Sequence, residues 1–233
     1  DAGDVCEKGD MLGVVTRGEA TYRALAAAGY DAGAPGNHDT GPYGLEALVH
    51  NVEVSRFPIV AANIVYEDDG TPVFPPTREV NADGVRVGII GGANGGKGTL
   101  NGRKVRALSE KELGEKIHSL AVEMRPRVDL VVAVVHLSSK SCKALALAAP
   151  EVQVWVSGHS HEVLHEPLRA PNNDALIVQA GQYARFVGEL RLTVDRQARQ
   201  VTSARGRLVE MDHTGIEPDT ELAERIAAWN RES

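Results

Sequence analysis

Side chains that can ligate a metal ion or transfer a proton stand at several points where short extended segments of the chain end. They are Asp4, Asn37, His38, His136, His159 and His161. The runs VVAVV and VQVWVSG, which precede His136 and His159, have the continuous apolar and β-branched composition of buried strands. Ligands in α/β sheets bind in the crevice outside the carboxyl ends of the strands. The pattern therefore predicts one site assembled from several strand ends.

The donor atoms of this set are oxygen and nitrogen, with no sulfur, and such donors suit Mn²⁺, Fe or Zn²⁺ better than a copper or iron–sulfur site. A carboxylate such as Asp4 can bridge two cations. Two cations about 3.5–4 Å apart can stabilise the attacking and leaving oxygens of a phosphoryl displacement. Taken singly, Asp4, Asn37 and His136 are more often turn, capping or hydrogen-bonded strand-end residues. The hypothesis of a dimetal site rests on the whole set.

Composition excludes several classes of protein. The 233 residues are 42% hydrophobic and 24% charged, as in an ordinary globular protein. A net charge of −7 gives no basic footprint for nucleic acid, and no apolar run approaches the roughly 20 residues of a membrane-spanning helix. Cys6 and Cys142 are too few for a disulfide framework or a thiolate zinc site. The sequence leaves the compartment and the oligomeric state open.

Strand-like and helical segments alternate, which predicts a single α/β layered domain over residues 1–233. The capping-box pairs Thr16 with Glu19 and Ser109 with Glu112 mark two helix starts, and Asp83-Gly84 marks a hairpin turn. Helices are expected over 16–30, 43–52, 109–125, 138–148 and 219–233. Strands are expected over 58–66, 77–92 as a hairpin, 129–136, 152–158, 175–181, 185–195 and 201–211, with the last two antiparallel.

The stretch GGANGGKG (91–98) nearly matches the phosphate-binding loop GxxxxGK[ST]. Gly98 stands where that loop needs a hydroxyl, and the following TLNGRK is expected to be loop rather than helix. These departures favour a mobile loop beside the site over a nucleoside-triphosphate site, and they leave Lys97 as an unsupported phosphate contact.

The spaced set GD, GNHD, H and GHSH resembles the calcineurin-like metallophosphoesterases. The resemblance is closest to the catalytic domain of the bacterial 5′-nucleotidase branch and covers nearly the whole chain, including GEATYRALAAAGYDAGAPGNHD and QAGQYARFVGELRLTVD. It implies a two-sheet β-sandwich flanked by helices, and two divalent ions (Mn, Zn or Fe). It also implies hydrolysis of nucleotides or similar phosphomonoesters by a metal-activated water. An exported or periplasmic location is suggested by the resemblance alone.

The resemblance assigns a role to each candidate residue. Asp4 would bridge the two ions, and His161 would bind the first ion. The second ion would be bound by Asn37, His136 and His159. His38 would not be a ligand but the general acid or transition-state stabiliser, a task that suits an imidazole near neutral pH.

Three departures from the family pattern limit these assignments. In the family, an Asp-x-His motif on the first strand precedes the position of Asp4, and this sequence has no such motif. The first metal site therefore lacks two expected ligands, and the sandwich lacks its first strand. We expect an amino-terminally incomplete sequence, because true loss of that strand would expose a sheet edge or leave a core gap. A single-metal or non-catalytic relative is the alternative.

The second departure is at Gly41, which occupies the place of an aspartate that orients the histidine of GNHD in the family. Asp39 is expected on extended backbone and is not assigned that role. No second domain for nucleoside recognition follows, and a thiosulfohydrolase-like activity on the same fold is a further alternative.

Overall fold

A six-stranded sheet forms the centre of the computed structural model, which describes residues 1–6, 11–171, 173–212, 214–215 and 217–232. Its strands, in spatial order, are β2 (Thr77–Ala82), β3 (Val85–Gly92), β6 (Leu130–Val135), β7 (Val154–Ser157), β9 (Leu176–Val178) and β8 (Leu168–Arg169). The inner strands β3, β6, β7 and β9 run parallel, and each edge strand runs antiparallel to its neighbour. The carboxyl ends of four strands therefore meet at one edge of this sheet.

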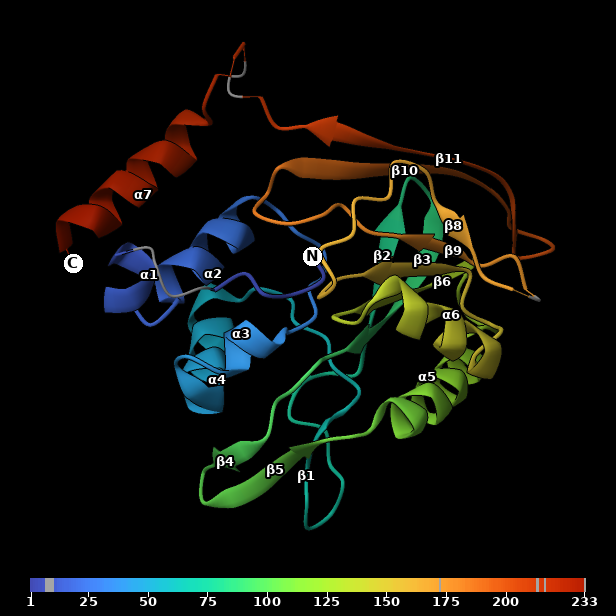
Figure 1. Cartoon of the computed structure of the whole chain (residues 1–233), viewed down its shortest axis with the longest axis horizontal. Coiled ribbons are helices and arrows are strands. Elements are labelled where there is room, and N and C mark those ends of the chain that lie inside the picture. The colour runs from blue at the N-terminus through green and yellow to red at the C-terminus, as the bar shows by residue number, and fades with distance from the viewer. Residues whose placement is uncertain (7–10, 172, 213, 216, 233) are drawn as a thin grey trace.

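Two helices cover one face of the sheet, α5 (Glu110–Met124) and α6 (Ser139–Ala148) (Figure 1). Leu113 and Ile117 of α5 are fully buried in one core cluster with Trp155 of β7. The predicted capping box is present, since Ser109 Oγ accepts the Glu112 N–H at 3.3 Å and Glu112 Oε2 accepts the Ser109 N–H at 2.8 Å. The predicted start of this helix is confirmed.

A long antiparallel hairpin covers the opposite face, formed by β10 (Phe186–Asp195) and β11 (Gln200–Glu210) (Figure 1). Leu190 and Leu192 pack with Val134 and Val154 of the central sheet in a second core cluster. The predicted two-sheet sandwich flanked by helices is confirmed. The central sheet is packed on both faces, against α5 and α6 on one side and against the hairpin on the other. A site at its edge is therefore built on a rigid element.

The amino-terminal third of the chain forms a helical subregion beside the sheet. Its helices are α1 (Met11–Val15), α2 (Glu19–Ala27), α3 (Asn37–Thr40) and α4 (Gly44–Ser55). Tyr22, Leu48 and Phe57 form the centre of its core, and the rings of Tyr22 and Phe57 meet edge to face at 5.6 Å between centroids. The chain start is anchored here, because Asp1 N donates to Ala32 O at 2.9 Å. A three-stranded sheet of β1 (Ile64–Tyr66), β5 (Arg103–Ala107) and β4 (Gly98–Leu100) extends below (Figure 1).

Three local predictions were wrong. Helix α2 begins at Glu19 with Gly18 as its N-cap, because Thr16 Oγ1 instead donates to Leu12 O at 2.7 Å in the preceding turn. The strand expected over 58–66 contains only Ile64–Tyr66 in strand geometry. The expected loop after Gly98 is the hairpin β4–β5, which turns at Asn101-Gly102 with φ of 52° and 76°.

The remaining helix, α7 (Thr220–Glu232), packs against α2. Within the part of the chain that the structure describes, no helix combines the length and the apolar character needed to cross a membrane.

Candidate metal centre

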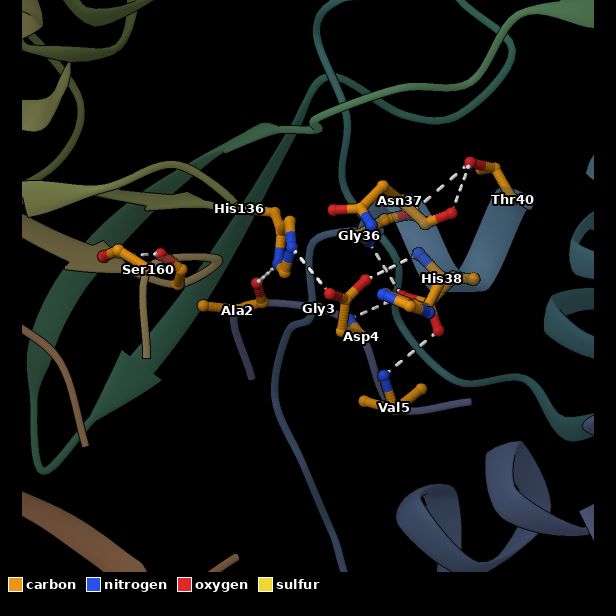
Figure 2. Close-up of polar contacts among 12 residues, drawn as sticks. Ala2, Gly3, Asp4, Val5, Gly36, Asn37, His38, Thr40, His136 and Ser160 are labelled. Atoms are coloured by element: carbon orange, nitrogen blue, oxygen red, sulfur yellow. Dashed lines mark hydrogen bonds and ion pairs between the residues drawn. The ribbon is translucent and has the colours of Figure 1, made fainter. Parts of the chain in front are cut away.

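Three side chains from distant parts of the sequence converge at the carboxyl edge of the central sheet. His136 follows β6, His159 follows β7, and Asp4 comes from the amino-terminal segment that lies against this edge. One potential ligand atom of each residue lies within 4.8 Å of the others. Figure 2 shows His136 beside Asp4, with Asn37 and His38 on the adjoining turn.

The hydrogen bonding of His136 fixes its tautomer. Its Nδ1 lies 2.6 Å from the carbonyl oxygen of Ala2, which can only accept, so Nδ1 carries a proton. In the neutral imidazole Nε2 then presents a lone pair, and this atom lies 3.0 Å from the carboxylate Oδ2 of Asp4 without hydrogen-bond geometry to any partner among the described residues. Two acceptors that face each other in a buried place need a cation or a proton between them.

The coupling between this pair is visible in the direction of both pKa values. Burial alone would lower the pKa of the His136 imidazole, but the Asp4 carboxylate raises it above its usual range. Burial alone would raise the pKa of the Asp4 carboxyl, but His136 and the His38 N–H lower it. Asp4 is therefore held as a carboxylate, the form that can bind a divalent ion.

Asn37 offers a second atom that could bind a metal ion and has no hydrogen-bond partner among the described residues. It opens the short helix α3, and its side-chain Oδ1 is buried without a hydrogen-bond partner among the described residues. Buried amide oxygens without a partner are rare in native structures, and a missing ion is one of their ordinary explanations. An amide oxygen is also a ligand type that binds hard and borderline divalent metals.

Backbone packing sets the position of Asp4. The residue is left-handed, with φ of 59°, and its Oδ1 accepts the backbone N–H of His38 at 2.7 Å. Gly36 permits this approach, since a Cβ added there would lie 2.1 Å from Asp4 Oδ1. The GNHD turn and the amino-terminal segment thus fit together only with glycine at this place.

The two histidines of the GHSH loop lie in different surroundings. Both are left-handed, with φ of 65° at His159 and 57° at His161. The His159 ring lies 5.2 Å from the His136 ring, and burial together with His136 lowers its pKa, which favours the neutral form that binds metals. Both histidines are exposed, but His161 lies outside the cluster of three ligands found among the described residues. Its ring centroid is 6.3 Å from that of Tyr183.

Two residues important for this geometry were missed by sequence reasoning. Asp39 lies on the helical turn of α3, so the prediction of extended backbone was wrong. Its buried carboxylate accepts backbone N–H groups of Asp4 and Gly36 on Oδ2 at 2.8 and 2.7 Å, and of Val5 and Cys6 on Oδ1, both at 3.1 Å. Burial raises the pKa of Asp39, and these backbone donors oppose that effect. The sequence signal that could have identified Asp39 is its place as an acidic residue at the third position of a helix, where a capping box has one.

Gln179 is the second missed residue. It follows β9 in the apolar run ALIVQAG, is 4% exposed, and lies beneath the GHSH loop, where its amide bonds the backbone on both sides of the two histidines. A single polar residue at the end of a buried strand was the only signal for it in the sequence.

The donor set fits a divalent metal ion. Asp4, His136 and His159 supply a carboxylate and two imidazoles, and the unpaired Asn37 oxygen lies on the neighbouring turn. Each of these donors is an oxygen or nitrogen atom of the kind that Mn²⁺, Fe and Zn²⁺ accept.

Several known proteins are similar to this chain in sequence or in fold. A 5′-nucleotidase of Diplobatis ommata is 26% identical over 253 aligned residues, which cover 98% of this chain and 42% of that protein. The structure of a 5′-nucleotidase precursor from Thermus thermophilus superposes with a TM-score of 0.81 at 27% identity, over 100% of this chain and 48% of that one. The chain has the metallophosphoesterase fold. The sulfate thiohydrolase SoxB of Thermus thermophilus has it too, with a TM-score of 0.83 at 21% identity, over 100% of this chain and 42% of that one.

The relatives and structural neighbours include 5′-nucleotidases and calcineurin-like metallophosphoesterases, so the resemblance predicted from the sequence is confirmed. No family model matches the chain. The chain spans less than half the length of both 5′-nucleotidases compared here. The similarity to SoxB, below a quarter identity, is a similarity of fold.

Proposed function

We propose that this chain is the catalytic part of a metal-dependent phosphoesterase that hydrolyses nucleotides or similar phosphomonoesters with two divalent ions. The observation that carries the proposal is the pair formed by His136 and Asp4. The Nδ1–H of His136 is committed to Ala2 O, and its Nε2 lies 3.0 Å from a carboxylate oxygen of Asp4, a distance at which the two atoms need a cation or a proton between them. This arrangement suits a cation shared by both groups.

In this proposal Asp4 would serve both ions. Asn37, His136 and His159 would hold the second ion together with it, and His161 would hold the first. When bound, the ions would supply Lewis-acid activation of water and neutralise charge on the phosphate. The metals are Mn, Zn or Fe, in keeping with the oxygen and nitrogen donors.

The remaining work falls to the protein itself. His38 follows the metal-binding Asn37 on the same helical turn, and its backbone N–H is held by Asp4 Oδ1 at 2.7 Å. A histidine fixed beside the ligands can donate a proton to a leaving alkoxide or a hydrogen bond to the phosphate. His38 is therefore the proposed general acid. Its backbone is hydrogen-bonded to Asp4, so the residue proposed to serve both ions also positions the proposed acid.

The test combines metal content with turnover. The 233-residue chain is incubated with Mn²⁺, excess metal is removed, and bound metal is counted by elemental mass spectrometry while hydrolysis of a nucleoside monophosphate is followed by phosphate release. Two equivalents with turnover would support the proposal and would mean that residues other than an Asp-x-His motif complete the first site. One equivalent without turnover would leave a single-metal binding protein, and the absence of both metal and turnover would overturn the proposal altogether.

A further inference from the structure

The backbone of the GHSH loop adopts a conformation that its residues disfavour. His159 and His161 both have positive φ, a region that residues with a Cβ seldom enter, and such conformations persist only where the surroundings impose them. We propose that Gln179 imposes this conformation and is a positioning residue for the metal-binding histidines. This inference rests on the proposed function, because it concerns how that site is held.

The amide of Gln179 bonds the backbone on both sides of the histidine pair. Its Oε1 accepts the N–H of Glu162 at 2.6 Å, immediately after His161. Its Nε2 lies 3.2 Å from the carbonyl oxygen of Gly158, immediately before His159. One rigid planar group thus fixes the distance between the two ends of the loop.

The same amide also fixes the middle of the loop. Gln179 Nε2 lies 3.1 Å from the hydroxyl of Ser160, the residue between the two histidines (labelled in Figure 2). Ser160 Oγ in turn donates to the Glu162 carboxylate at 2.7 Å. Gly158 and Ser160, the two residues of the GHSH loop that are not histidines, therefore both lie within hydrogen-bond distance of the Gln179 amide.

Glu162 ties this loop to the rigid body of the domain. Its carboxylate accepts the backbone N–H of Ser139 at 3.1 Å and the Ser139 hydroxyl at 2.9 Å, at the start of α6. The loop is consequently held between α6 on one side and the end of β9 on the other.

The chain offers a matched control at the opposite end of β7. Gln153 also bridges backbone groups through its side-chain amide, because Oε1 accepts the Val131 N–H at 3.1 Å and Nε2 donates to Arg199 O at 3.0 Å. It precedes β7, whereas the GHSH loop follows it. A purely structural role for Gln179 would make its replacement equivalent to replacement of Gln153.

The experiment measures Mn²⁺ affinity of the full chain by calorimetric titration after treatment with a chelator, with thermal unfolding of the metal-free proteins recorded in parallel. Methionine is close to glutamine in length and volume but makes no such hydrogen bonds. We expect Gln179→Met to raise the Kd for Mn²⁺ by roughly 10–100-fold, the usual effect of losing a group that orients metal ligands. Gln153→Met should lower thermal stability yet leave this Kd within about twofold, because it leaves those ligands in place.

Ser160→Ala supplies a second variant, because Ser160 is exposed and its replacement does not open the core. We expect this variant also to raise the Kd for Mn²⁺. If Gln179→Met does not fold, Ser160→Ala decides the question. Unchanged affinity in the folded variants, or equal weakening by Gln153→Met, would overturn the role of Gln179 alone. A wild-type chain that binds no Mn²⁺ would instead overturn the proposed function, and the inference with it.

Discussion

The carboxylate of Asp39 accepts the backbone N–H of Asp4 at 2.8 Å, although 34 residues separate them and neither belongs to a strand. The carboxylate of Asp4 in turn accepts the backbone N–H of His38, the residue before Asp39. The two segments are therefore joined by reciprocal bonds. Each carboxylate fixes the backbone that carries the other, so the proposed bridging ligand is positioned by the turn that holds the proposed general acid.

Replacing Asp39 by Asn should loosen this junction. The amide retains one acceptor oxygen, so two of the four backbone N–H groups lose their partner, and each buried unpaired donor costs about 1–3 kcal/mol. Chemical denaturation would measure the decrease in the free energy of unfolding. The control is Asp195→Asn, because Asp195 Oδ1 accepts the N–H groups of Gln197 and Ala198 on the exposed surface. Equal losses in both variants would contradict a special role for Asp39.

Replacing Gly36 by Ala should damage the site directly. The added methyl group would lie 2.1 Å from Asp4 Oδ1 and 2.5 Å from Asp4 N, so one segment must move. We expect a loss of about 1–3 kcal/mol in unfolding free energy, typical of overpacking, together with weaker Mn²⁺ binding. Gly98→Ala is the control, since its methyl group would meet nothing within 4 Å. Undiminished Mn²⁺ binding by the Gly36 variant would show that the observed fit is not required.

Replacing His38 by Ala should separate binding from catalysis. Loss of a general acid lowers turnover by about 10²–10⁴-fold. Mn²⁺ binding should persist, because the contact to Asp4 is made by the backbone N–H, which alanine retains. Phosphate release and calorimetric titration measure the two quantities. His118→Ala serves as the comparison, because His118 pairs with Glu151 on the surface and should leave turnover unchanged. If the His38 variant keeps wild-type turnover, another group is the acid.

Replacing Glu112 by Gln should change how stability depends on pH. The bonds from Ser109 and from Arg106 lower the pKa of this carboxyl from 4.5 to about 2. A depressed folded-state pKa stabilises the protein above the unfolded value, and this contribution disappears as pH falls from about 4.5 to about 2. The melting temperature of the wild type should therefore exceed that of the variant near neutrality and approach it in acid.

Thermal unfolding monitored by circular dichroism between pH 7 and pH 2 measures this difference. Glu115→Gln, on the exposed side of the same helix, controls for the loss of one negative charge, because Glu115 caps no helix end. A difference for the Glu112 variant that stays constant across the pH range would contradict the role of the capping box.

The features that the sequence alone determined are those set by near neighbours in the chain. Ser109 and Glu112 are three residues apart, so their capping box starts α5 whatever surrounds it. Asp83 and Gly84 accept positive φ and therefore turn β2 into β3 without help from the rest of the protein. The strand ends that carry His136 and His159 were equally predictable from continuous apolar runs.

Tertiary structure decided which of those strand ends meet and what holds them. His136 and Asp4 are 132 residues apart, and the tautomer of His136 depends on the carbonyl of Ala2, a contact that no local pattern encodes. The same holds for Asp39 and Gln179, whose types suit many buried or capping roles. A polar side chain acquires its function from the groups that packing brings within hydrogen-bond distance, and here those groups come from segments that fold together only when the whole sandwich forms.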